Sequence, residues 1–182
     1  MADPPDQMAE GIAAWAEGRG VAGEGVVDVP PRPVAAGGEV RLLEVTGETV
    51  RAICLLQVAP EQRGSVAPNA VSLAEAMFEP KAWFRAIVAD GVPVGFVMLS
   101  VDTATPAYYL WRYMIDARYQ GRGYGRAALA LVLDHVRSLP QARELLVSWV
   151  PGPDGPEGFY LGLGFEPTGE VDEGEVVGRL RL

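Results

Sequence analysis

The sequence predicts an α/β protein in which a central mixed β-sheet is flanked by helices. Apolar stretches with strand patterning alternate with stretches whose apolar residues recur at helical spacing. The predicted strands lie next to one another early in the chain and are separated by helices later, which is typical of a sheet with antiparallel and parallel neighbours. The chain has 182 residues, 49% of them hydrophobic, and is therefore long and apolar enough for one core.

The first predicted elements begin at Glu39. Residues 39–45 alternate as a strand, and Thr46 follows as a candidate helix cap. The apolar residues of the helix that it would cap are Val50, Ile53, Cys54 and Val58. A second short helix is predicted from Ser72 and ends before Pro80, which cannot continue it.

The rest of the sheet is predicted from a hairpin onward. Two apolar runs within residues 83–101 flank Asp90-Gly91, a two-residue turn signal that predicts two antiparallel strands. The remaining elements are a strand at 107–115, a long helix with the apolar face Leu129, Val132, Leu133 and Val136 before Pro140, a strand at 144–150, a short helix at 158–163 and a strand at 175–182. The unit from 107 to 150 should form a right-handed parallel crossover.

Composition excludes several classes of protein. The formal net charge is −9, which argues against a nucleic-acid-binding surface. No stretch has the length of a membrane span and the first residues are acidic, so we expect a cytoplasmic protein without membrane contact. One cysteine (Cys54) and one histidine (His135) leave no internal disulfide and no expected metal site, and both are interpreted as packing or surface residues. Residues 1–38, rich in Gly, Pro and Ala, are interpreted as a flexible leader before a domain at 39–182.

A glycine-rich loop joins the strand at 107–115 to the long helix. The first N–H groups of a helix lack internal partners and carry partial positive charge, and glycines let an anion approach them closely. The loop therefore predicts a pyrophosphate site, and its residues are Gln120, Gly121, Arg122, Gly123, Tyr124, Gly125 and Arg126. Because the sixth position of the G-x-G-x-x-G pattern is Arg126, and no G-K-[ST] is present, neither a dinucleotide fold nor a nucleoside-triphosphate loop is indicated.

The loop matches the pattern Q/R-x-x-G-x-G/A, and the chain from about residue 39 to 182 resembles the GNAT superfamily of N-acetyltransferases. The resemblance implies that the loop holds the pyrophosphate of acetyl-CoA as co-substrate. A second stretch supports it, because Tyr160 precedes Gly164-Phe165 by four residues, as in the family's Y-x-x-x-G-F segment. In the family that tyrosine often reaches the coenzyme sulfur, which suits a phenol as general acid. One departure is that Pro153 and Pro156 stand where relatives often have Asn and Ala.

The resemblance also implies a reaction. We expect direct attack by an amine in a ternary complex, with main-chain groups of Met114 and Ile115 contacting the pantetheine and the thioester. Within the superfamily the sequence is most similar to bacterial spermine/spermidine acetyltransferases, and the carboxylates expected to bind a polyamine are Glu75, Glu79, Asp172, Glu173 and Glu175. Surface acidity explains these carboxylates equally well. The alternatives are an acetyltransferase for an aminoglycoside, an amino acid or a protein amine, and a non-catalytic CoA-binding module; a homodimer is a family expectation.

Overall fold

The computed structural model describes residues 38–104, 106–153 and 155–182. The leader predicted for residues 1–38 lies outside this part of the chain except for Gly38. The described residues form one sheet in the order β1-β2-β3-β4-β5-β7-β6. Its strands are β1 (Val40–Leu43), β2 (Ala82–Ala89), β3 (Val92–Asp102), β4 (Ala107–Ile115), β5 (Glu144–Trp149), β6 (Glu166–Asp172) and β7 (Glu175–Arg181). The α-helices are α2 (Val50–Cys54), α3 (Asn69–Ala76), α4 (Tyr124–Arg137) and α5 (Glu157–Leu161), and the 3-10 turns are η1 (Pro60–Gln62) and η2 (Ala117–Tyr119).

The mixed sheet flanked by helices is confirmed. The strands β2 and β3 pair antiparallel across the predicted turn, where Asp90 and Gly91 have φ angles of 48° and 78°. Positive φ at both central residues is what a type I′ hairpin turn requires. The strands β4 and β5 pair parallel around α4, which confirms the parallel crossover predicted from the sequence.

The first helix and its cap were predicted wrongly, and one strand was not predicted. The first helix is only Val50–Cys54, so Val58 lies beyond it, and the residue before the helix is Thr49. Thr46 does not cap with its side chain; its main-chain oxygen accepts the N–H groups of Thr49 and Val50. The strand β6 was not predicted, because every residue of it is exposed and it therefore lacks the alternation that marks a half-buried strand.

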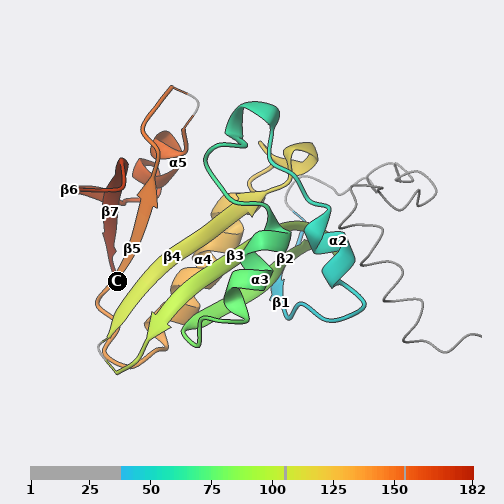
Figure 1. Cartoon of the computed structure of the whole chain (residues 1–182), viewed down its shortest axis with the longest axis horizontal. Helices are drawn as coiled ribbons and strands as arrows, with labels where there is room; N and C mark the ends of the chain where they lie inside the picture. Colours follow the sequence, from blue (N-terminus) through green and yellow to red (C-terminus); the bar gives the residue numbers. More distant parts are fainter. Residues whose placement is uncertain (1–37, 105, 154) are drawn as a thin grey trace, which may run out of the picture. The chain divides into compact units, whose positions relative to one another are not determined.

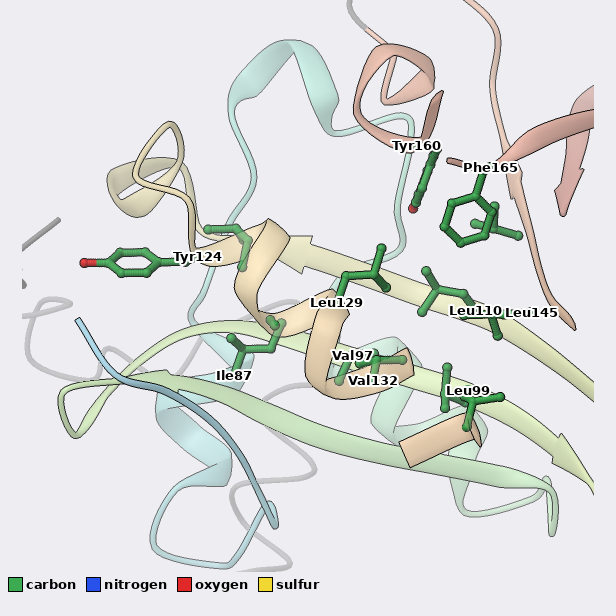
Figure 2. Packing of buried hydrophobic residues seen from close by; sticks show 14 of the residues in the cluster. Ile87, Val97, Leu99, Leu110, Tyr124, Leu129, Val132, Leu145, Tyr160 and Phe165 are labelled. Carbon is green, nitrogen blue, oxygen red and sulfur yellow. The ribbon is translucent and has the colours of Figure 1, made fainter. Parts of the chain in front are cut away.

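The helices cover both faces of the sheet. Alternate residues of β3 point to opposite faces, with Val97 and Leu99 packing in the cluster around α4 and Phe96 and Met98 packing in the cluster around α2 and α3. Figure 1 shows α4 on one side of the sheet and α2 and α3 on the other. Figure 2 shows Val97 and Leu99 of the sheet beside the buried side chains of α4. No described helix is both long enough and apolar enough to span a bilayer.

The sheet opens between β4 and β5. Their parallel pairing is confined to Tyr109 with Leu146 and Leu110 with Val147. Beyond these pairs the two strands diverge, as Figure 1 shows. A bulge in the β3–β4 register, where Met98 pairs with Arg112 but Leu99 pairs with Leu110, falls at the same point. The second half of β4 therefore borders a gap in the sheet rather than a neighbouring strand.

Candidate active site

A cavity of about 1310 Å³ occupies the region where β4 and β5 separate. Its lining comes from segments far apart in the sequence, which are residues 62–68, β4 from Tyr109 to Ile115, the glycine loop, α5 and the β6–β7 turn. A volume of this size is at or above the upper end of ligand pockets in proteins. The glycine loop and a group of carboxylates both open into this one space.

The glycine loop has the geometry of an anion cradle. Gly121 and Gly123 have φ angles of 72° and 83°, in the left-handed region that favours glycine, and Gly123 is the residue before α4. A Cβ atom added at either position would meet no atom within 4 Å, so both glycines face open space. The first main-chain bond of the helix runs from Ala127 N–H to Gly123 O. Within the described part of the chain, the N–H groups of Gly123, Gly125 and Arg126 precede that bond and lack protein acceptors.

The arginines of the loop differ in what they contact. The guanidinium of Arg118 donates to both oxygens of the buried Asp116 carboxylate, at 2.8 and 3.1 Å, so its charge is compensated. The Nη2 atom of Arg122 donates to the main-chain oxygen of Arg118 at 2.9 Å, and that of Arg126 donates to Gly162 O at 3.1 Å. The side chains of Arg122 and Arg126 are exposed at the rim and can add positive charge beside a bound phosphate.

The side chains of Gln120 and Tyr124 have structural roles in the loop. The Nε2 atom of Gln120 donates to Gln62 Oε1 at 2.7 Å and to Ile115 O at 2.9 Å, so this side chain braces the loop against β4 and η1. The Tyr124 side chain is only 1% exposed and belongs to the core around α4. Figure 2 labels it at the beginning of the helix. Only the main chain of Tyr124 is therefore suited to a phosphate contact.

The main-chain N–H and C=O groups of alternate residues in β4 point toward the gap. The N–H group of Asp116 donates to Val94 O in β3, and Met114 is two residues earlier, so the main-chain groups of Met114 also face β3. The same parity turns the main-chain groups of Tyr113 and Ile115 toward the gap, where Ile115 O accepts from Gln120. The Met114 side chain is buried on the α2 and α3 face. Of the two residues predicted to contact pantetheine, Ile115 has the suitable orientation and Met114 does not.

Tyr160 lies between the core and the cavity. Its ring is 5% exposed, stacks on Trp149 at a centroid distance of 5.5 Å and meets Phe165 edge to face at 5.5 Å. Figure 2 shows the Tyr160 and Phe165 rings together at the end of α5. Burial raises the pKa of the Tyr160 hydroxyl well above its usual range, and the nearby Tyr109 and Glu175 raise it further. This hydroxyl therefore holds its proton at neutral pH and can act as a donor.

Carboxylates also line the cavity. They are Glu79, Asp172, Glu173 and Glu175, and the arginines of the same lining are Arg63, Arg112 and Arg126. Glu75 does not line the cavity; it pairs with Arg112 at 3.2 Å, so the charge of Arg112 is partly compensated. Of the two substrate carboxylates predicted on the second short helix, Glu79 borders the cavity, whereas Glu75 lies outside the lining and pairs with Arg112.

Sequence reasoning missed Tyr109 and Ser148 as lining residues. They belong to β4 and β5, whose patterns predicted strands but not the separation that exposes these side chains. The bulge opposite Leu99 and the sparse β4–β5 pairing leave no mark in a single sequence.

Among the described residues, no group of three or more His, Cys, Asp and Glu side chains is arranged to hold a metal ion. Cys54 is partly buried on α2, and His135 stacks on Trp83 at 4.1 Å.

This chain resembles known proteins in sequence and in architecture. The model of the acetyltransferase (GNAT) family matches residues 55–165. The spermine/spermidine N(1)-acetyltransferase of Bacillus subtilis is 27% identical over 143 residues, which cover 73% of this chain and 91% of that protein. The crystal structure of the PaiA N-acetyltransferase of Thermoplasma acidophilum in complex with coenzyme A superposes with a TM-score of 0.59 at 15% identity, covering 79% of this chain and 99% of that one. The GNAT domain of S. lividans PAT gives a TM-score of 0.64 at 17% identity, covering 80% and 90% of the two chains.

The residues present suit acetyl-CoA. The left-handed glycines, the N–H groups without protein acceptors and the arginines at the rim fit a pyrophosphate, and the open edge of β4 fits an amide-bearing arm. The protonated Tyr160 borders the same cavity. The family match covers more than half of the chain and agrees with this geometry. The chain therefore belongs to the acetyltransferase (GNAT) family and is an acetyl-CoA-dependent N-acetyltransferase.

Proposed function

We propose that this acetyltransferase acetylates a primary amine of a polyamine or a similar small polycation. The observation that carries the proposal is the set of cavity carboxylates, Glu79, Asp172, Glu173 and Glu175, which lie in the lining shared with Tyr160. Of the arginines in the same lining, Arg112 is paired with Glu75, Arg63 donates to Gln57, and Arg126 belongs to the glycine loop. A cavity with several carboxylates favours a substrate with more than one ammonium group. Similarity to a protein named spermine/spermidine N(1)-acetyltransferase supports the same substrate class.

The chemistry assigned to the chain is alignment and proton transfer. Acetyl transfer from a thioester to an amine requires aligned reactants, a polarised carbonyl and a protonated leaving sulfur. We assign the pyrophosphate contacts to the main chain of the glycine loop, and the pantetheine and thioester contacts to the main-chain groups of Tyr113 and Ile115, which face the gap. Tyr160 is the proton donor to the sulfur, because its phenol lines the cavity and is protonated at neutral pH.

An amine panel tests the proposal. Thiol release from acetyl-CoA, with mass detection of the product, is measured for spermidine, spermine, a simple alkyl monoamine, an aminoglycoside, an amino acid and a peptide. We expect kcat/KM to be highest for the polyamines. In Asp172→Asn, kcat/KM for spermidine should fall about tenfold, because each well-placed charge contact contributes on the order of 1–2 kcal/mol. The monoamine should be less affected.

A matched control separates this effect from general acidity. Glu170 is an exposed carboxylate on the same hairpin, and it does not line the cavity. Glu170→Gln changes the net charge by the same amount and should leave spermidine kinetics unchanged. Preference for the aminoglycoside, the amino acid or the peptide, or equal effects of the two variants, would contradict the polyamine assignment while leaving the acetyltransferase chemistry intact.

A further inference from the structure

We propose that Glu175 is the catalytic group that accepts the proton of the attacking amine, and that Ser148 is a positioning residue that fixes the Glu175 carboxylate. The inference rests on the proposed function only in requiring an amine acceptor, whichever amine that is. It separates Glu175 from the other cavity carboxylates, to which the proposed function assigns binding alone.

The pairing of β5 with β7 places the two side chains together. Ser148 pairs with Val177, and Glu175 is two residues before Val177 on β7, so Ser148 and Glu175 are diagonal neighbours on one face of the sheet. The Oγ atom of Ser148 donates a hydrogen bond to Oε2 of Glu175. Both residues line the cavity, and both are half-buried. A carboxylate held by a neighbouring strand at a cavity wall has a defined direction, which a proton acceptor requires.

The other cavity carboxylates lack this arrangement. Asp172 and Glu173 are exposed in the β6–β7 turn. Glu79 is half-buried, but its Oε1 atom accepts the main-chain N–H of Lys81, on the opposite side of the β4–β5 gap. Only the Glu175 carboxylate, among those lining the cavity, combines partial burial with a side-chain hydrogen bond that itself lies in the lining.

Glu175 also lies near the proton donor. The negative charge of Glu175 raises the pKa of Tyr160 and that of Tyr109, so it acts on both hydroxyl groups. Ser148 interacts with Tyr109 as well, and this contact lowers the pKa of Tyr109 against the larger effect of burial. The groups facing Glu175 are thus Ser148 on β5, Tyr109 and Arg112 on β4, Tyr160 on α5 and Asp172 and Glu173 in the turn.

The proposed reaction includes two proton transfers, one to Glu175 and one from Tyr160. As the bond between the amine nitrogen and the acetyl carbon forms, the nitrogen becomes positively charged and far more acidic than the free ammonium, and it gives its proton to the Glu175 carboxylate. The carbon–sulfur bond breaks with its electron pair going to sulfur, which takes the proton of Tyr160. Glu175 then releases its proton to solvent and Tyr160 takes one back, so both side chains return to their starting state.

The test compares pH profiles of kcat and kcat/KM in four proteins, using the best amine of the panel. They are the wild type, Glu175→Gln, Ser148→Ala and the control Glu170→Gln. We expect Glu175→Gln to lower kcat by about 100-fold or more, the range of a lost general base, and to abolish the loss of activity on the acidic side that reflects protonation of Glu175. Ser148→Ala should lower kcat about tenfold but keep that acidic limb, because the carboxylate remains. Glu170→Gln should match the wild type.

Two further measurements keep the result decisive. Calorimetric titration with acetyl-CoA should give wild-type affinity for every variant, which verifies folding independently of turnover. Glu175→Asp, which retains a carboxylate, should recover part of kcat and keep the acidic limb. An increase of the amine KM in Glu175→Gln with unchanged kcat would overturn the inference and leave Glu175 a binding residue. A wild type that turns over another amine but not spermidine would instead refute the polyamine proposal alone.

Discussion

From the left-handed conformation of Gly123 we predict that Gly123→Ala lowers both the free energy of unfolding and the affinity for the coenzyme. At φ of 83° an L-residue is strained, whereas a Cβ atom there would meet nothing within 4 Å. Gly123→Ala therefore isolates backbone strain, worth about 1–2 kcal/mol, from any steric clash. Part of this is offset by the lower entropy of the unfolded alanine chain, about 0.4–1 kcal/mol, so the net loss of stability should be about 1 kcal/mol.

Gly158→Ala is the matched control. Gly158 lies inside α5, its φ is outside the left-handed region and a Cβ atom there also meets nothing within 4 Å. Alanine is the better helix former by about 0.5–1 kcal/mol, so this variant should gain stability. Urea unfolding measures both free energies. A Gly123→Ala protein as stable as the wild type would show that Gly123 is not left-handed in solution.

The same variant, Gly123→Ala, should weaken coenzyme binding. If the alanine introduced there relaxes toward negative φ, its N–H group turns away from the anion site, and one hydrogen bond to a phosphate is lost. A hydrogen bond to a charged group contributes about 1.5–3 kcal/mol, so affinity for CoA should fall about tenfold or more. Calorimetric titration checks this, and wild-type affinity in Gly123→Ala would contradict the assignment of this N–H to the phosphate.

Three further predictions concern single side chains. Tyr160→Phe should lower kcat about 100-fold with little change in acetyl-CoA affinity; because the pKa of Tyr160 is raised, wild-type kcat should not fall on the alkaline side through loss of this proton below pH 10. Asp116→Asn should cost about 2 kcal/mol in a urea titration at pH 7. Burial opposes ionisation of Asp116, but the hydrogen bonds that its carboxylate accepts from Arg118 and the Gln57 N–H have the larger effect and lower the pKa of Asp116. The stabilisation by the ionised carboxylate is therefore present above about pH 4 and is lost as pH falls through the lowered pKa. His135 has a pKa lowered by burial and by the charge of Arg85, so stability should fall as pH drops from about 6.5 toward that lowered pKa, and this loss should shrink in His135→Phe.

The sequence predicted the parts of the fold that local patterns specify. The Asp90-Gly91 hairpin, the strand Ala107–Ile115 and the apolar face of α4 follow from turn chemistry and hydrophobic periodicity. The strand β6 did not, because its side chains are all exposed and a register shift between Pro167 and Val171 interrupts its pairing with β7. Its existence depends on β7 as a partner rather than on its own pattern.

The site was predicted in the same uneven way. The glycine loop and Tyr160 could be identified because their residue types and spacing carry the chemistry locally. The orientation of Met114 toward β3 and the contact between Ser148 and Glu175 depend on strand register. Register is a long-range property that one sequence does not specify, so Tyr109 and Ser148 emerge as lining residues only from the structure.

Binding of the coenzyme diphosphate by the main chain of the glycine loop is the claim on which the site depends. The direct measurement is calorimetric titration of acetyl-CoA into the wild type, Gly123→Glu and Gly47→Glu. Gly47 also faces open space, and it lies outside the cavity lining, so Gly47→Glu adds the same charge elsewhere. We expect the wild type and Gly47→Glu to bind equally well and Gly123→Glu not to bind, because a carboxylate fills the anion site. Equal affinity in all three proteins would contradict it.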